Sequence, residues 1–89
     1  MRRIRQHQRF RKDLKKVKAR GKDGQKLSDA VYALARLGQV PITLRPHRLG
    51  GAWADFWECH LEPDWLLVYS VSDTEVILVR TGTHADLFE

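Results

Sequence analysis

Apolar residues recur at helical spacing twice in the first half of the chain. Phe10, Leu14 and Val17 stand at positions i, i+4 and i+7, a spacing that predicts a helix with one narrow apolar face. Gly21 follows this stripe, where it suits the end of a helix. A second stripe ends before Gly38 and comprises Leu27, Val31, Leu34 and Ala35. We therefore expect two helices that form a hairpin.

The apolar period changes to two in the second half of the chain. Residues 53–62 alternate between the two faces of a strand. Residues 65–71 and 76–81 form continuous apolar runs rich in branched and aromatic side chains, and residues 72–74 make a tight turn between them. At the start of the chain, residues 2–7 have no helical stripe and are expected to form a short polar edge strand.

These elements predict an α+β fold in which a two-helix hairpin packs on a small antiparallel sheet of four strands. The hairpin covers one face of the sheet, and the other face is expected to stay open. Residues 40–52 contain two prolines and two glycines, so they are expected to form an irregular connection. Thr83 is placed to cap a single helical turn. With 43% hydrophobic residues, residues 1–89 are expected to form one domain.

Charge is distributed unevenly along the chain, whose net charge is +5. Residues 1–26 carry twelve basic and two acidic side chains, whereas residues 27–89 carry four basic and nine acidic ones. Such a basic segment indicates a polyanionic partner, which can be a nucleic acid, an anionic membrane surface or an acidic protein. The candidates for contacts with such a partner, RNA or the ribosome among the possibilities, are Arg9, Arg11, Lys12, Lys15, Lys16, Lys18 and Arg20.

The sequence offers no membrane-spanning segment and no pair of thiols. Its longest apolar runs fall far short of the roughly 20 residues that cross a bilayer. Basic residues also stand where a secretory signal would have its apolar core. We therefore expect a cytoplasmic protein without a membrane partner. Cys59 is the only cysteine, so it forms neither an internal disulfide nor a thiolate zinc cluster.

Three histidines, His47, His60 and His84, stand near turns or strand ends in the second half of the chain. Histidine titrates near neutrality and is the commonest general acid or base. Asp64 follows His60 by four residues and Arg80 precedes His84 by four, so neighbouring strands can bring them together. These residue types suit metal-free RNA cleavage, which needs a base, an acid and a cation for the phosphorane. A zinc site is the alternative, although no two histidines have the helical spacing of a zinc motif.

Three stretches of the chain are distinctive: residues 47–53 (HRLGGAW), residues 59–69 (CHLEPDWLLVY) and residues 80–88 (RTGTHADLF). Together they resemble the YafQ-like toxins of the RelE/ParE superfamily, which implies a RelE-like fold. The resemblance implies a toxin of a bacterial type II toxin-antitoxin system, an endoribonuclease (mRNA interferase) that cleaves messenger RNA in the ribosomal A site. It also implies a cognate acidic antitoxin, through which the complex can bind operator DNA. No metal or organic cofactor is expected.

The resemblance places the family's functional residues, position by position, on His47, His60, Asp64, Trp65, Arg80, His84 and Phe88. It implies that His60, Asp64 and His84 share the acid and base roles, with His47 assisting. It further implies that Arg80 stabilises the transition state and that Phe88 orients the nucleotide. Which histidine is the base stays open. The sequence departs from the family pattern at Pro46 and Trp57.

Two other functions would keep this fold without the catalysis. Some ParE relatives poison DNA gyrase by binding alone. A basic module that binds RNA or the ribosome would account for the charged helix. Neither function needs the set of histidine, aspartate and arginine near the C-terminal end, so the sequence favours the endoribonuclease.

Overall fold

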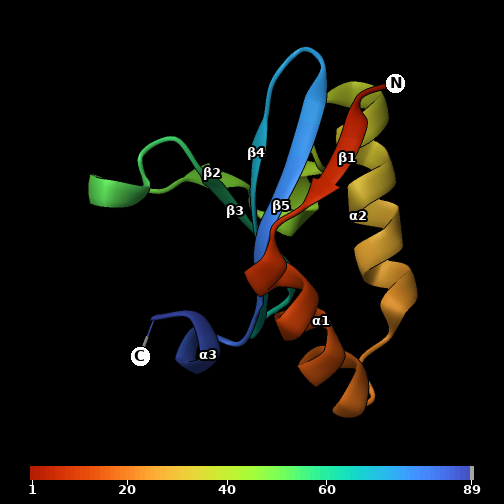
Figure 1. The fold of residues 1–89 in the computed structure, drawn as a ribbon, viewed down its shortest axis with the longest axis vertical. Helices are drawn as coiled ribbons and strands as arrows, with labels where there is room; N and C mark the ends of the chain where they lie inside the picture. The colour runs from red at the N-terminus through yellow and green to blue at the C-terminus, as the bar shows by residue number, and fades with distance from the viewer. Residues whose placement is uncertain (89) are drawn as a thin grey trace.

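The computed structural model describes residues 1–88, whose strands form one mixed sheet (Figure 1). The strands are β1 (Arg3–Gln6), β2 (His47–Arg48), β3 (Trp57–Glu62), β4 (Trp65–Val71) and β5 (Glu75–Gly82). They are arranged in the order β1-β5-β4-β3-β2. β1 runs parallel to β5, and all other neighbours are antiparallel.

Two long helices and one short helix accompany the sheet. They are α1 (Gln8–Ala19), α2 (Gly24–Leu37) and α3 (His84–Phe88). Asp23 caps α2, since its carboxylate accepts a hydrogen bond from the Gln25 backbone N–H at 2.9 Å. Gly38 ends α2 with a φ of +74°, a left-handed conformation that suits glycine. No helix within residues 1–88 is long and apolar enough to cross a bilayer.

The core lies between α1, α2 and one face of the sheet. Phe10 and Val17 of the predicted α1 stripe are buried, and Leu14 packs against them from the margin. The other large members of this cluster are Leu27, Leu34, Val40, Leu61, Trp65, Leu67, Tyr69, Val76 and Leu78. Burying each of these side chains contributes about 1.5–3 kcal/mol to stability. The apolar periodicity of the sequence therefore identified the residues that hold the helices on the sheet.

The α+β class is confirmed, but the predicted purely antiparallel sheet of four strands is wrong. β1 pairs in parallel with β5, with Arg3 opposite Glu75, because the chain crosses over through the rest of the fold before β5 returns beside it. β2 is a fifth strand inside the segment expected to be irregular, and it pairs for only two residues. Neighbouring Pro46 and Gly50 keep this strand short.

Two further expectations about the layers also need correction. Figure 1 shows α1 and α2 splaying apart from their connection, whereas the sequence predicts a hairpin. α1 packs chiefly along β5. The second face of the sheet is not fully open, because Leu66 and Val68 alternate with Leu67 along β4 and are buried too. The single helical turn expected near the C-terminus is present as α3, and Thr83 caps it.

Candidate active site

Three imidazole rings lie close together although they come from three separate elements. His47 is in β2, His60 is in β3 and His84 begins α3. The centre of the His60 ring lies 6.0 Å from that of His47 and 5.9 Å from that of His84, so His60 is the middle member. The antiparallel pairing of β2 with β3 brings the first two rings together, with His47 opposite Glu58.

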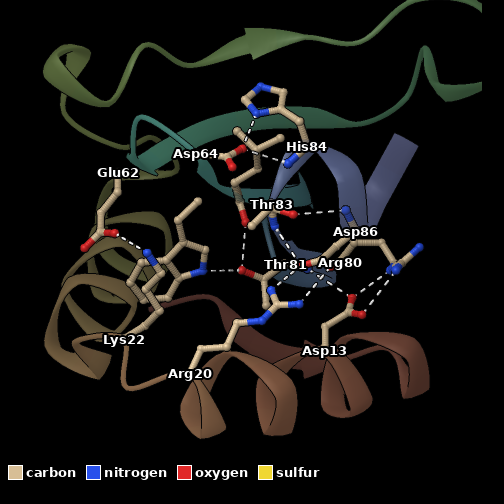
Figure 2. A network of polar contacts seen from close by, with 12 residues as sticks. Asp13, Arg20, Lys22, Glu62, Asp64, Arg80, Thr81, Thr83, His84 and Asp86 are labelled. Atoms are coloured by element: carbon tan, nitrogen blue, oxygen red, sulfur yellow. Dashed lines mark hydrogen bonds and ion pairs between the residues drawn. The ribbon is translucent and has the colours of Figure 1, made fainter. Parts of the chain in front are cut away.

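Asp64, in the turn between β3 and β4, holds the third ring (Figure 2). Its Oδ1 accepts hydrogen bonds from the His84 backbone N–H at 2.9 Å and from His84 Nδ1 at 2.6 Å. These bonds, the backbone one first, lower the pKa of Asp64 below its ordinary value, so it remains a carboxylate. Because a carboxylate only accepts, Nδ1 of His84 carries a proton, and Nε2 is the ring atom left to exchange protons with a substrate.

His60 is in a different electrostatic environment. Its Nδ1 is buried and has no hydrogen-bond partner within residues 1–88. Burial is the main cause that lowers the pKa of His60 below 6.5, and the Arg45 guanidinium adds to it. His47 and His84 act in the same direction, and Glu58 opposes them only in part. The neutral form of His60 is therefore favoured, which suits a group that accepts a proton.

Glu58 is a candidate that the sequence analysis did not single out. Its side chain is only 7% exposed, and Oε1 lies 3.4 Å from Nε2 of His47. His47 Nδ1 lies 3.2 Å from the carbonyl oxygen of Arg45 and donates to it. Glu58 therefore fixes the orientation of the His47 ring through its contact with Nε2. The sequence could have indicated Glu58, because side chains alternate along β3 and those of Glu58 and His60 lie on the same face.

Arg80 does not contact the three histidines. Its Nε and Nη2 bind the two carboxylate oxygens of Asp13 at 2.6 Å and 3.1 Å, and both side chains are largely buried. Asp13 also accepts the Thr81 backbone N–H at 3.2 Å, beyond the point where β1 stops pairing with β5. Asp13 thereby accepts a backbone hydrogen bond from a part of β5 that has no pairing with β1. Figure 2 shows Arg80 turned towards α1 and the His84–Asp64 pair at a separate place.

A family model described as a bacterial toxin of a type II toxin-antitoxin system, YafQ, matches residues 2–89. The chain belongs to this family. The mRNA interferase toxin YafQ of Escherichia coli K12 is 38% identical over 80 residues, which cover 89% of this chain and 87% of that protein. The same toxin from E. coli in its DinJ–YafQ complex superposes with a TM-score of 0.91 at 36% identity, over 100% of both chains. A metal-bound toxin from Helicobacter pylori superposes with a TM-score of 0.90 at 39% identity, over 99% of this chain and 100% of that chain.

The aromatic residues of this YafQ-family toxin divide into buried and exposed ones. Trp65 is part of the core, where its Nε1 donates to Thr81 Oγ1 at 2.9 Å. Trp57 packs partly against the core, with the Arg48 guanidinium 6.0 Å from its ring centre. Phe88, in contrast, is 48% exposed on α3, the helix that His84 begins. Phe88 is thus the exposed aromatic side chain of these three.

The basic residues of α1 also differ from one another. Six of the seven candidates are exposed and make no ion pair within residues 1–88: Arg9, Arg11, Lys12, Lys15, Lys16 and Lys18. Arg20 is the exception, because its guanidinium binds both carboxylate oxygens of Asp86 in α3. The toxin therefore keeps a basic helix face, but Arg20 is engaged within the fold.

The zinc site that the sequence left as an alternative would need several ligating side chains around one point. Within the described residues, no group of three or more His, Cys, Asp or Glu side chains is arranged to hold a metal ion. Nδ1 of His84 is bonded to Asp64, and Nδ1 of His47 is bonded to a carbonyl oxygen. The imidazoles of His47 and His84 are thus each held by a separate protein group, whereas Nδ1 of His60 has no hydrogen-bond partner in the part of the chain that the structure describes.

Proposed function

We propose that this toxin is an mRNA interferase, a ribosome-dependent endoribonuclease that cleaves messenger RNA in the A site by acid and base chemistry, and that residues 1–89 form its single domain. The observation that carries this proposal is the row of three imidazoles in which Asp64 fixes the tautomer of His84. The similarity to the mRNA interferase toxin of E. coli supports the substrate class. A protein that acts only by binding gyrase has no need for this row.

The proposed reaction uses the two differing environments of His60 and His84. His60, whose lowered pKa favours the neutral ring, takes the proton from the 2′-hydroxyl. The 2′-oxygen then bonds to the adjacent phosphorus while the bond from phosphorus to the 5′-oxygen breaks. His84 gives a proton from Nε2 to that leaving oxygen, and Asp64 holds the Nδ1 side of the ring during this step. His47, oriented by Glu58, assists beside His60.

The phosphorane also needs positive charge and a positioned base. Arg80 is the cation proposed to stabilise the negative charge of the phosphorane. Asp13 binds its Nε and Nη2, which leaves Nη1 without a partner within residues 1–88. Arg45 is a second cation near the site, since its charge acts on His60. The exposed Phe88 ring is proposed to stack on the nucleotide and orient it. Orientation of this kind can supply several kcal/mol of the barrier reduction.

Cleavage of translated message tests the assignment. We expect His60→Ala and His84→Ala to reduce cleavage by about 10² to 10⁴ each while ribosome binding is retained. His7→Asn is the matched control, because His7 caps α1 through its side chain and Asn preserves such a cap. The same purified RNA without ribosomes should be cut far less by the wild type. Full cleavage by both histidine variants would show that the catalytic groups lie elsewhere in the toxin, whereas a wild type that arrests growth without cleaving message would favour a toxin that acts by binding alone.

The basic face of α1 is proposed to hold ribosomal RNA through phosphate contacts. Such binding weakens steeply with salt, with a log-log slope of about 0.7 to 0.9 per phosphate neutralised. Replacing Lys12, Lys15, Lys16 and Lys18 by Gln should lower ribosome affinity and reduce this slope without changing which codons are cut. Ribosome binding that does not respond to salt in the wild type would contradict this interpretation.

An acidic antitoxin is the proposed protein partner, as in the DinJ–YafQ complex of E. coli. A groove of about 670 Å³ between β1, α1 and α2 suits it, since the groove has an apolar floor and basic residues at its margin. The floor includes Ile4, Phe10, Leu14, Leu27 and Val31, and the margin includes Arg2, Lys18 and Lys22. This combination fits the apolar face of an amphipathic segment flanked by acidic side chains.

Two substitutions on α2 separate this groove from the rest of the helix. Tyr32 lines the groove and is 54% exposed, so Tyr32→Glu would place a like charge before an acidic antitoxin without disturbing the core. We expect at least a tenfold loss of antitoxin affinity and a loss of growth rescue on co-expression. Leu37→Glu is the control, because Leu37 is exposed on the same helix outside the groove. Equal effects of the two substitutions would move the docking site elsewhere.

A further inference from the structure

The short helix α3 carries two of the proposed site residues but has no buried residue of its own. His84 is its first residue and Phe88 is its last. A helix of five residues does not persist in isolation, because its nucleation is unfavourable and it gains few hydrogen bonds. The position of His84 therefore depends on contacts that come from outside α3.

Asp86 makes most of these contacts (Figure 2). Its Oδ2 accepts the Thr83 backbone N–H at 3.0 Å, and Thr83 Oγ1 accepts the Asp86 backbone N–H at 3.0 Å, so the two residues form a reciprocal cap. Arg20, at the C-terminal end of α1, donates from Nη1 and Nη2 to the two Asp86 oxygens at 2.5 Å and 3.1 Å. This bond to Arg20 is the main reason why the pKa of Asp86 lies well below its usual range.

Gly82, the residue before Thr83, leaves the space that the Asp86 side chain occupies. Gly82 has a φ of +152°, which side chains rarely allow, and it lies where β5 meets α3. A Cβ atom on Gly82 would lie 2.8 Å from Oδ2 of Asp86, closer than such atoms approach one another. Glycine therefore permits both the turn of the backbone and the approach of the carboxylate to Arg20.

We propose that Arg20 is a positioning residue of the toxin: its ion pair with Asp86 clamps α3 against the end of α1 and so aligns His84. This inference rests on the proposed endoribonuclease activity. Asp64 fixes the His84 ring from one side, and the Arg20–Asp86 pair fixes the helix that carries it from the other. The assignment changes the role that the sequence indicated for Arg20, which was a direct contact with RNA.

Kinetics on translated message distinguish the two roles of Arg20. We expect Arg20→Ala and Asp86→Ala each to lower the cleavage rate at saturating ribosome concentration by about tenfold to a hundredfold, because small misplacements of a catalytic group have effects of this size. The ribosome concentration that gives half-maximal rate should change less than threefold. The double variant should be no worse than either single variant, and Arg20→Lys should recover part of the rate. Lys16→Ala, an exposed basic residue of α1 without an ion pair in the described chain, should do the reverse and weaken binding only.

A second measurement does not depend on cleavage. In Arg20→Ala, the proton on His84 Nδ1, which bonds to Asp64 in the wild type, should exchange faster with solvent and shift in the NMR spectrum. Circular dichroism confirms that the variant is folded. The proposal is overturned if Arg20→Ala weakens ribosome binding like Lys16→Ala while the saturated rate and the His84 resonance are unchanged. A wild type that does not cleave message would refute the proposed function, whereas an altered His84 resonance would still support the clamp.

Discussion

Replacing Asp13 by Asn tests how much the fold depends on the one acidic residue of α1. Asp13 binds Arg80 through both carboxylate oxygens and accepts the Thr81 backbone N–H. The side chains of Asp13 and Arg80 are only 13% and 12% exposed, so solvent screens their attraction weakly. Asn keeps the size of the side chain and one acceptor oxygen for Thr81. It removes the charge and leaves the Arg80 guanidinium without its counterion.

The expected loss of stability follows from this geometry. Removing one partner of a fully buried ion pair costs about 3–5 kcal/mol, because the other charge remains desolvated. Since these side chains are partly accessible and Asn preserves the Thr81 bond, we expect about 2–3 kcal/mol for Asp13→Asn. In a chain of this size, 1 kcal/mol shifts Tm by about 4–8 °C, so Tm should fall by about 10–20 °C.

Urea and thermal unfolding followed by circular dichroism measure this loss. Asp73→Asn is the control, because Asp73 is exposed in the turn between β4 and β5, and it should change stability by less than about 0.5 kcal/mol. Replacing both partners, as in Asp13→Leu with Arg80→Met, should be less destabilising than Asp13→Asn alone. If Asp13→Asn behaves like the control, or if the two substitutions of the pair simply add, the ion pair does not stabilise the edge of β5.

Three further predictions concern single groups. Folding lowers the pKa of His60, so as the pH falls the imidazole is protonated in the unfolded chain before it is protonated in the folded one. The free energy of unfolding should therefore be independent of His60 above about pH 6.5 and decrease below it. His60→Gln should remove this part of the pH dependence in urea titrations. Gly82→Ala should lower the free energy of unfolding by about 1–3 kcal/mol in the same assay. Gly24→Ala should not lower it, because a Cβ atom at Gly24 would have no other atom within 4 Å. Burial raises the pKa of Cys59 to about 12, so a maleimide should label it only as fast as the protein unfolds, and rapid labelling of native protein would contradict its place in the core.

The helices and the three central strands were predictable because their signal is local. The stripe of Phe10 and Val17 and the apolar run from residues 65 to 71 both record burial, and burial recurs with the period of the element. The position of β1 left no such record, since all four of its residues are exposed and it is held to β5 by backbone hydrogen bonds and one exposed ion pair, Arg5–Glu75. A polar strand can pair in parallel or antiparallel without any change in its pattern.

Register irregularities were equally invisible in the sequence. Tyr69 lies opposite Leu78 and Val68 lies opposite Arg80, so Val79 has no partner across β4. This bulge shifts the faces of the following residues relative to a regular strand. A similar shift between His60 and Glu62 in β3 brings Glu62 to Lys22 near the helices. Alternation therefore predicted the strands but not where each side chain near their ends would point.

The same distinction explains which parts of the candidate site followed from the sequence. His60, Asp64 and His84 could be grouped because strand ends that neighbour one another in a meander meet at one edge. The pairs Asp13–Arg80 and Arg20–Asp86 join residues 67 and 66 positions apart, and a basic helix has the same composition whether its cations face RNA or a carboxylate. One signal was nevertheless present. Asp13 is the only acid among the basic residues of α1, and its carboxylate reaches the sheet, where it binds Arg80 and the Thr81 backbone N–H.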